Sequence, residues 1–166
     1  MIVIYPGSFD PVTVGHIDIV RRGVVIASTL IVAVSDNPNK KHLFTVEERA
    51  VLLQKALANV PGSDKIEVAS FTGLLADYAK HRGVGFILRG IRNAADYDNE
   101  TPYAEVNRRV SGIETLFLTA NPALSYVASR IVREAVALGV CESVLGAMVP
   151  PEVLPALKHR IANPTT

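Results

Sequence analysis

The segment YPGSFDPVTVGHIDI, residues 5–19, concentrates residues that could bind an anion. Gly7 and Gly15 let a backbone approach a ligand closely, and Ser8, Thr13 and His16 supply neutral hydrogen-bond donors. A helix that begins near His16 would add free N–H groups and a partial positive charge, which favour a phosphate. A bare Gly-His pair is more often a loop histidine beside capping hydroxyls, so the segment by itself leaves both interpretations open.

Other common site patterns fit this segment poorly. It lacks the G-x-G-x-x-G fingerprint and the Walker loop, which argues against hydride transfer and P-loop phosphoryl transfer. A metal-ligand role for His16 is disfavoured, because no second histidine lies at a ligand spacing on the same helix. The sequence therefore predicts an anion site with no metal ligand from the protein.

Basic residues follow two further apolar runs. A lysine pair at 40–41 comes after LIVAVS, while Arg89 ends the run FILRG and Arg92 follows it. A lysine pair is usually part of a solvated surface. An arginine buried at the end of a strand needs an anionic partner, which is either a ligand or a salt bridge to Asp96 or Asp98.

The elements that must position these residues are short β-branched runs alternating with helical patterns. The runs are MIVIY, LIVAVS, KIEVAS, FILRG and ETLFLTA. Apolar residues at consecutive positions suit strands that are buried on both faces, so we expect an α/β fold with a doubly wound, open, parallel five-stranded sheet. Ligands of such sheets bind beyond the carboxyl ends of the strands, where residues 6–16 fall.

Helix signals are clear in some places and indirect in others. Thr45 and Glu48 form a capping box at the start of a helix, and the Pro-Gly pair at 61–62 closes that segment. Pro102 predicts that a later helix starts between Asn99 and Thr101. The remaining expected helices span 74–82, about 101–110, 125–138 and 151–160.

Length and composition favour one domain over residues 1–162 with a loose end at 163–166. With 17 basic and 16 acidic side chains, the chain has no bulk attraction to nucleic acid or to an anionic membrane. The single cysteine, Cys141, excludes an internal disulfide and is expected to be a small buried residue. No signal peptide is visible, and the longest apolar run is shorter than the ~20 residues of a membrane span, so we expect a cytoplasmic protein.

Four segments carry a resemblance to a known family: YPGSFDPVTVGH, NKKHLFTVEER, FILRGIR and IVRE. In this order and at these separations, they resemble the phosphopantetheine adenylyltransferases, a family of the (H/T)-x-G-H nucleotidyltransferase superfamily. The resemblance implies a Rossmann-like nucleotidyltransferase fold. It also implies transfer of AMP from ATP to 4'-phosphopantetheine with Mg²⁺, giving dephospho-coenzyme A and pyrophosphate. The attacking phosphate is already largely dianionic at pH 7, so no general base is required.

The resemblance also assigns roles to residues. His16, Lys40 and Arg89 would be catalytic, with His16 stabilising the α-phosphate in the transition state. The acceptor would contact Ser8, Lys40, Leu75 and Arg89, with Lys41 and His42 at the rim. From its helical pattern alone, Leu75 is a core residue, whereas the family places it along the pantetheine arm. The residues expected to bind ATP are Ser8, Phe9, His16, Gly90, Ile91, Arg92, Glu100, Leu124, Ser125, Tyr126, Val127, Ala128, Ser129 and Arg130.

Two stretches depart from the family pattern. VASR replaces a serine-rich I-S-S-S/T stretch, and DNETPYA replaces an acidic, aromatic one. We expect Arg130 to turn inward toward the ATP phosphates, because an arginine in a first helical turn opposes the helix dipole unless an anion is near. Analogy further implies a homohexamer and competition by coenzyme A. The motifs alone also fit a nucleotide-binding sensor, or a relative that uses glycerol phosphate or nicotinamide mononucleotide.

Overall fold

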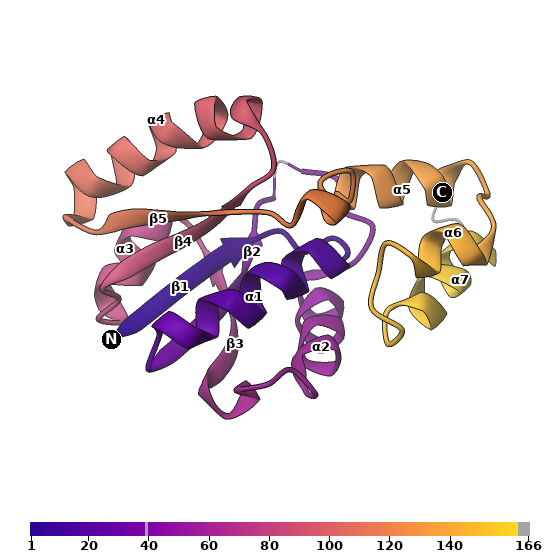
Figure 1. Ribbon diagram of the computed structural model, residues 1–166, viewed down its shortest axis with the longest axis horizontal. Helices are drawn as coiled ribbons and strands as arrows, with labels where there is room; N and C mark the ends of the chain where they lie inside the picture. Colours follow the sequence, from indigo (N-terminus) through magenta and orange to yellow (C-terminus); the bar gives the residue numbers. More distant parts are fainter. Residues whose placement is uncertain (39, 163–166) are drawn as a thin grey trace.

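Five parallel strands form the sheet in the residues that the computed structural model describes, 1–38 and 40–162 (Figure 1). Each strand coincides with one of the predicted apolar runs. In chain order they are β1 (Ile2–Gly7), β2 (Thr29–Asp36), β3 (Ile66–Thr72), β4 (Phe86–Ile91) and β5 (Glu114–Thr119). The spatial order is β3-β2-β1-β4-β5, with every neighbouring pair parallel. The predicted doubly wound α/β fold is therefore confirmed.

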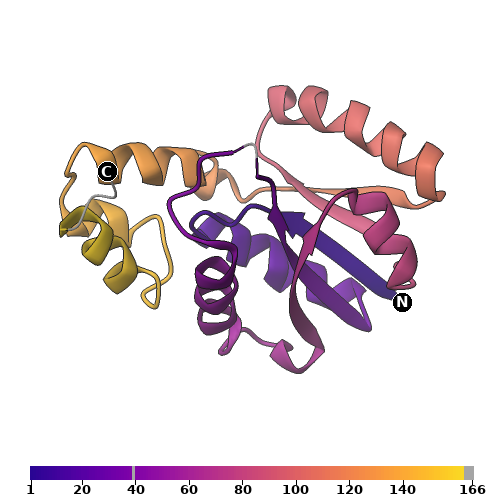
Figure 2. The ribbon, with the colours of Figure 1, turned by 180° about the vertical axis from the view of Figure 1, so that it is seen from behind.

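Helices cover both faces of the sheet. α1 (Val14–Ile26) and α2 (Val46–Leu57) pack on one face, and α3 (Leu75–His81) and α4 (Ala94–Ser111) on the other. Side chains of β1 alternate between the faces: Val3 and Tyr5 join the cluster on the α1 side, and Ile4 joins the cluster on the α3 side. Helices α5 (Ser129–Ala137), α6 (Glu142–Gly146) and α7 (Leu154–Ala162) gather beyond the carboxyl ends of the strands (Figures 1 and 2).

The order of strands reverses between β1 and β4, so the ends of these two strands mark the expected ligand site. Helix α1 packs very closely there. A Cβ at Gly90 would lie 2.9 Å from the Ile19 side chain, and one at Gly23 would lie 2.6 Å from Leu88. Glycine at both positions therefore lets the helix that follows the first turn sit tightly against β4.

Helix α4 begins earlier than predicted. It starts at Ala94, where the Asn93 side chain accepts a hydrogen bond from the Asp96 N–H at 2.9 Å, and it runs through Pro102. The prediction of a start between Asn99 and Thr101 was wrong because Pro102 removes only the bond to the carbonyl of Asp98. α4 has no buried residue, so that carbonyl lies on a solvated helix, where its loss of a partner costs little.

Helix α5 starts at Ser129 rather than at the predicted Ser125. Residues Pro122–Leu124 form a separate 3₁₀ turn, and the Ser125 hydroxyl donates to the Pro122 carbonyl at 2.9 Å. Cys141 is also not where it was predicted: it is exposed, because it precedes the short helix α6 at the surface. The predicted loose end at 163–166 lies outside the described residues, and the one-domain assignment stays a prediction.

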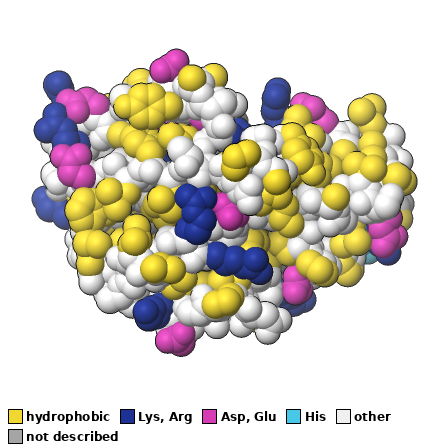
Figure 3. All heavy atoms as spheres, in the orientation of Figure 1, with side chains coloured by type: hydrophobic (Ala, Val, Ile, Leu, Met, Phe, Trp, Pro, Cys, Tyr) yellow, Lys and Arg dark blue, Asp and Glu magenta, His cyan; other side chains and the backbone are white. Residues whose placement is uncertain are grey.

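The surface carries no concentrated charge on the face shown in Figure 3. Lys and Arg side chains are scattered there and alternate with Asp and Glu, as expected from a formal net charge of +1. Within residues 1–38 and 40–162, no helix combines the length and apolar character that crossing a bilayer requires.

Candidate active site

The T-x-G-H turn fixes the ring of His16. Thr13 is the N-cap of α1: its hydroxyl accepts from the His16 N–H at 3.4 Å, and its own N–H donates to His16 Nδ1 at 3.0 Å. Because Nδ1 accepts a backbone hydrogen bond, the proton of the neutral ring is on Nε2. Burial, with smaller contributions from Arg92 and Arg89, lowers the pKa of His16 to about 4. His16 is thus a neutral N–H donor at pH 7.

The ring of Phe9 packs against the ring of this histidine. Its backbone is left-handed, with φ of 48°, and its buried ring meets the His16 ring edge-on at a centroid distance of 5.0 Å. A Cβ on Gly7 would lie 3.0 Å from the Phe9 ring, so glycine is required for this close approach. Phe9 therefore acts through packing and does not line either cavity described below.

The first cavity lies over the carboxyl ends of β1 and β4 and extends to the start of α5. Its volume is about 360 Å³. Most residues predicted to bind ATP line it, while Phe9, Ile91, Ser125 and Tyr126 do not. The predicted residues on its wall are Ser8, His16, Gly90, Arg92, Glu100, Leu124, Val127, Ala128, Ser129 and Arg130.

Arg89 and Arg92, two of the arginines that line the first cavity, are held by carboxylates from α4. Arg89 donates from Nε and Nη2 to Glu100 at 2.7 and 2.5 Å, and from Nη1 to the Pro6 carbonyl at 2.8 Å. Arg92 makes a two-pronged pair with Asp96, at 2.7 and 3.0 Å, which lowers the pKa of that carboxyl. The salt-bridge alternative is therefore realised for Arg92 with Asp96, whereas the partner of Arg89 is Glu100.

A second cavity, of about 700 Å³, adjoins the first. The two share Pro6, Gly7, Ser8, Arg89 and Glu100. The wall of the second cavity also includes Lys40, Leu75, Val106 and Thr115. Leu75 is half-buried and packs against the core, as its helical pattern predicts, and it also lines the cavity. Its contact with a pantetheine arm stays a prediction.

Helix α5 contributes two arginines to the first cavity. Arg130 lines it, but the Arg130 side chain is 76% exposed and lies 3.9 Å from Glu134. Arg133, which sequence reasoning missed, also lines the cavity and donates to the Asp10 carbonyl at 2.6 Å. Its place one turn after Ser129, on a helix at the carboxyl edge of the sheet, was the available signal. The Ser129 hydroxyl donates to the Pro11 carbonyl at 2.8 Å.

Two further predictions concern the loop after β2. Lys41 is exposed, as a residue at the rim would be. His42 is not at the rim: its side chain is 14% exposed, and its Nδ1 lies 3.3 Å from the buried carboxylate of Asp10. The His42 ring is held inward because the next two residues, Leu43 and Phe44, donate their N–H groups to the same carboxylate. No sequence signal pairs residues 10 and 42, which lie far apart along the chain.

Fold and site together define a nucleotidyltransferase-type α/β protein, with a histidine at a helix start and arginines around a cavity of about 360 Å³. A family model described as cytidylyltransferase-like matches residues 4–135. The phosphopantetheine adenylyltransferase of Kocuria rhizophila is 44% identical over 93% of this chain and 96% of its own length. That of Thermotoga neapolitana is 40% identical over 97% of each. The chain belongs to the phosphopantetheine adenylyltransferase family, which confirms the resemblance.

A solved structure shows the same fold at much lower sequence identity. Nicotinic acid mononucleotide adenylyltransferase of Plasmodium falciparum, complexed with NaAD, superposes with a TM-score of 0.71 at 13% identity. The match covers 96% of this chain and 95% of the other. The shared architecture is therefore that of a Rossmann-like nucleotidyltransferase.

Proposed function

We propose that the protein transfers the adenylyl group of ATP to 4'-phosphopantetheine, giving dephospho-coenzyme A and pyrophosphate. The observation that carries the proposal is the pair of adjoining cavities that share Ser8, Arg89 and Glu100. A nucleotide in the first cavity and a phosphate-terminated acceptor in the second would meet at this shared wall. The apolar continuation past Leu75 and Val106 suits an arm made mostly of amides and methylenes.

The chemistry follows from positioning and charge. An oxygen of the acceptor phosphate attacks the α-phosphorus, and the bond to the bridging oxygen breaks, so that pyrophosphate leaves with the electron pair. The Nε2–H group of His16 donates a hydrogen bond to the α-phosphate, and this bond strengthens as negative charge builds up there. Lys40 and Arg89 hold the attacking phosphate, since Lys40 is a mobile point charge and Arg89 a fixed fork.

The arginines keep donors for this task. Arg89 uses three of its five N–H groups on Glu100 and Pro6, so two remain for a phosphate. Glu100, which was expected to bind ATP, thereby orients Arg89. At the other end, Arg92, Arg133 and the N–H groups that begin α5 surround the space for the β- and γ-phosphates.

We propose that Mg²⁺ enters as part of the ATP complex. Among the described residues, no three His, Cys, Asp or Glu side chains form a cluster that could hold a metal. The carboxylates of the first cavity, Asp96 and Glu100, are engaged by arginines. Mg²⁺ commonly binds through substrate phosphates with few protein ligands, and it would neutralise charge on the pyrophosphate that leaves.

The proposal extends to location and assembly. We place the reaction in the cytoplasm, in a homohexamer, with coenzyme A competing for the acceptor cavity. Helix α4 supports assembly, because it has no buried residue and exposes Tyr103, Val106 and Val110, which lie three and four residues apart on one side of the helix. Such an apolar face suits contact with further copies of the chain.

A parallel assay tests the reaction. Purified protein, ATP and Mg²⁺ are offered 4'-phosphopantetheine, glycerol 3-phosphate or nicotinamide mononucleotide, and pyrophosphate is measured. We expect release only with 4'-phosphopantetheine. Release with another acceptor would reassign the substrate, and ATP binding without acceptor-dependent release would indicate a nucleotide sensor.

A further inference from the structure

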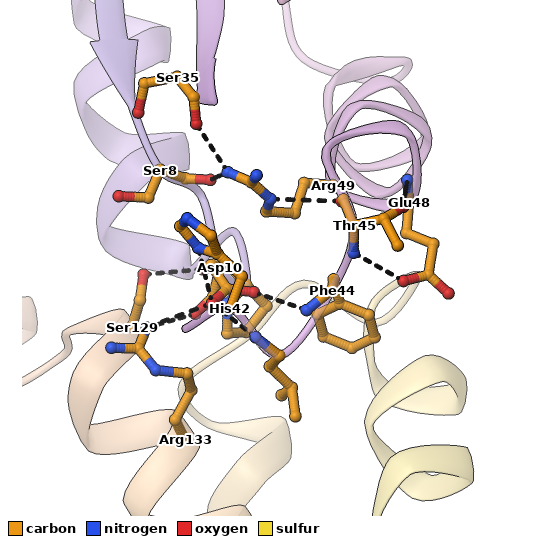
Figure 4. Close-up of polar contacts among 12 residues, drawn as sticks. Ser8, Asp10, Ser35, His42, Phe44, Thr45, Glu48, Arg49, Ser129 and Arg133 are labelled. Atoms are coloured by element: carbon orange, nitrogen blue, oxygen red, sulfur yellow. Dashed lines mark hydrogen bonds and ion pairs between the residues drawn. The ribbon is translucent and has the colours of Figure 1, made fainter. Parts of the chain in front are cut away.

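Asp10 is a buried carboxylate that lies three residues before the T-x-G-H turn, with 1% of its surface exposed. Its Oδ1 accepts from the Phe44 N–H at 3.0 Å, and its Oδ2 accepts from the Leu43 N–H at 2.9 Å. The ring of His42 lies against Oδ2 at 3.3 Å (Figure 4). A buried carboxylate requires such partners, and these three all come from one segment, residues 42–44.

Segment 42–44 follows Lys40 along the chain. Lys40 lines the second cavity from the loop that follows β2, which ends at Asp36, and the bonds to Asp10 hold the residues at the other end of that loop. Arg49 of α2 holds the beginning of the same loop, because it donates to the carbonyl of Ser35 in β2 at 2.9 Å and to that of Ser8 at 2.8 Å (Figure 4). Two buried charges of opposite sign thus connect the His16 turn to the loop that carries Lys40.

The carboxylate acts mainly on this loop and little on α5. Arg133 donates to the main-chain carbonyl of Asp10 at 2.6 Å and lies 3.7 Å from Oδ2. The shorter contact does not depend on the Asp10 side chain. A change of carboxylate to amide therefore perturbs the Lys40 loop while the bond to α5 stays in place.

We propose that Asp10 is a positioning residue for the adenylyl transfer. Its carboxylate fixes residues 42–44 so that Lys40 stays on the wall of the acceptor cavity that Arg89 also lines. Asp10 lines neither cavity, so it acts through Lys40 and does not touch a substrate. This role rests on the proposed function, which assigns the acceptor phosphate to Lys40.

The test is Asp10→Asn, alone and combined with Lys40→Ala. The amide keeps the size of the side chain, but its NH₂ group cannot accept from a backbone N–H, so one buried hydrogen bond is lost. We expect the KM for 4'-phosphopantetheine to rise about tenfold and the KM for ATP to change less than about twofold. In the Lys40→Ala background, Asp10→Asn should change the acceptor KM by less than about twofold, because the residue it positions is gone.

A matched control is Glu48→Gln, which also replaces a carboxylate that accepts from the backbone N–H of Thr45, at the start of α2. It should leave both KM values unchanged. Amide hydrogen exchange at Leu43 and Phe44 supplies a readout independent of turnover, and it should accelerate in Asp10→Asn only. If Asp10→Asn does not fold, His42→Ala keeps both backbone bonds. That variant should raise the acceptor KM about threefold, an effect that disappears in the Lys40→Ala background.

An Asp10→Asn effect that persists undiminished without Lys40 would overturn the positioning role while leaving the reaction intact. Equal losses for ATP and acceptor would overturn it as well. Absence of turnover in the unaltered protein would instead overturn the proposed function together with this role, and it is visible before any variant is compared.

Discussion

At the scale of single residues, His16 shows how a turn selects the chemistry of a side chain. Thr13 caps the helix and donates to Nδ1, so the remaining ring proton is on Nε2, and burial keeps the ring neutral. The sequence predicted the residue and its place at a helix start. It did not predict the low pKa, because desolvation and the two neighbouring arginines arise only from tertiary packing.

We predict that His16→Ala keeps the fold and slows AMP transfer by at least ~100-fold, the scale for removing one transition-state donor. The capping hydroxyl of Thr13 remains, so α1 should persist. Single-turnover kinetics measures the chemical step, and circular dichroism checks the fold. Near-normal turnover in a folded variant would contradict the role of His16.

The pKa of His16 also predicts a pH dependence of stability. The unfolded histidine has a pKa near 6.5 and the folded one near 4, so below pH 6.5 the unfolded chain binds a proton that the folded chain does not. The free energy of unfolding should fall as the pH drops from 6.5 toward 4. Relative to His16→Ala, the unaltered protein should lose up to about 2 kcal/mol between pH 7.5 and 5. Urea unfolding of both proteins at the two pH values measures this, and equal losses would exclude the low pKa.

Lys40 and Arg89 differ in which cavities they line, and their variants should differ accordingly. Lys40→Ala should weaken 4'-phosphopantetheine binding without affecting ATP, whereas Arg89→Ala should weaken both, the acceptor more. Each loss should be about tenfold or more, since each change removes a charge-assisted hydrogen bond. Calorimetric titration of each ligand tests this, with the exposed Lys41→Ala as control. Equal losses for both ligands in the Lys40 variant would reduce its role to general electrostatics.

At the scale of elements, the strands were predictable and some helix starts were not. The central strands β1, β2 and β4 are buried, and the edge strands β3 and β5 are partly covered, so in each strand an apolar run marks its place in the sheet. The start of α4 depends instead on the Asn93 cap and on how much a surface helix tolerates Pro102. The start of α5 depends on the 3₁₀ turn at Pro122–Leu124, where the Ser125 hydroxyl donates to the Pro122 carbonyl. A serine can cap a helix or close such a turn, and helix propensity does not decide between the two.

The first turn of α5 carries a prediction about Arg130. Its exposed ion pair with Glu134 is weak, so the guanidinium is free to turn toward a phosphate bound at the helix start. We expect Arg130→Ser to weaken ATP binding about threefold or more, because a charge-assisted bond is replaced by that of a hydroxyl. Arg109→Ser is a matched control, since Arg109 is similarly exposed, at 75%, and pairs with Glu105 four residues before it. Unchanged or tighter ATP binding in Arg130→Ser would show that Arg130 holds no phosphate.

At the scale of the whole molecule, the site is assembled by contacts between distant segments. The sequence predicted that residues 6–16, the Lys40 loop and Arg89 meet at one edge of a parallel sheet. It did not predict which side chains pair there, such as Arg89 with Glu100 or Asp10 with residues 42–44. These pairings depend on the order of strands and on the position of α4, neither of which has a local sequence signal.

We expect the exposed surface of α4 to form contacts between the chains of the proposed homohexamer. Helix α4 exposes Val110 by 50% on a helix that has no buried residue, so a further copy would be its natural cover. Val110→Glu should therefore shift the proposed homohexamer toward smaller species, because a charge buried at an apolar contact costs several kcal/mol, on the order of 3 or more. Sedimentation velocity at micromolar concentration measures the species present. Val25→Glu is the control, since Val25 is an apolar residue on α1 that is 79% exposed. A monomeric unaltered protein would contradict the homohexamer, and an unchanged assembly in Val110→Glu would place its contacts on a surface other than α4.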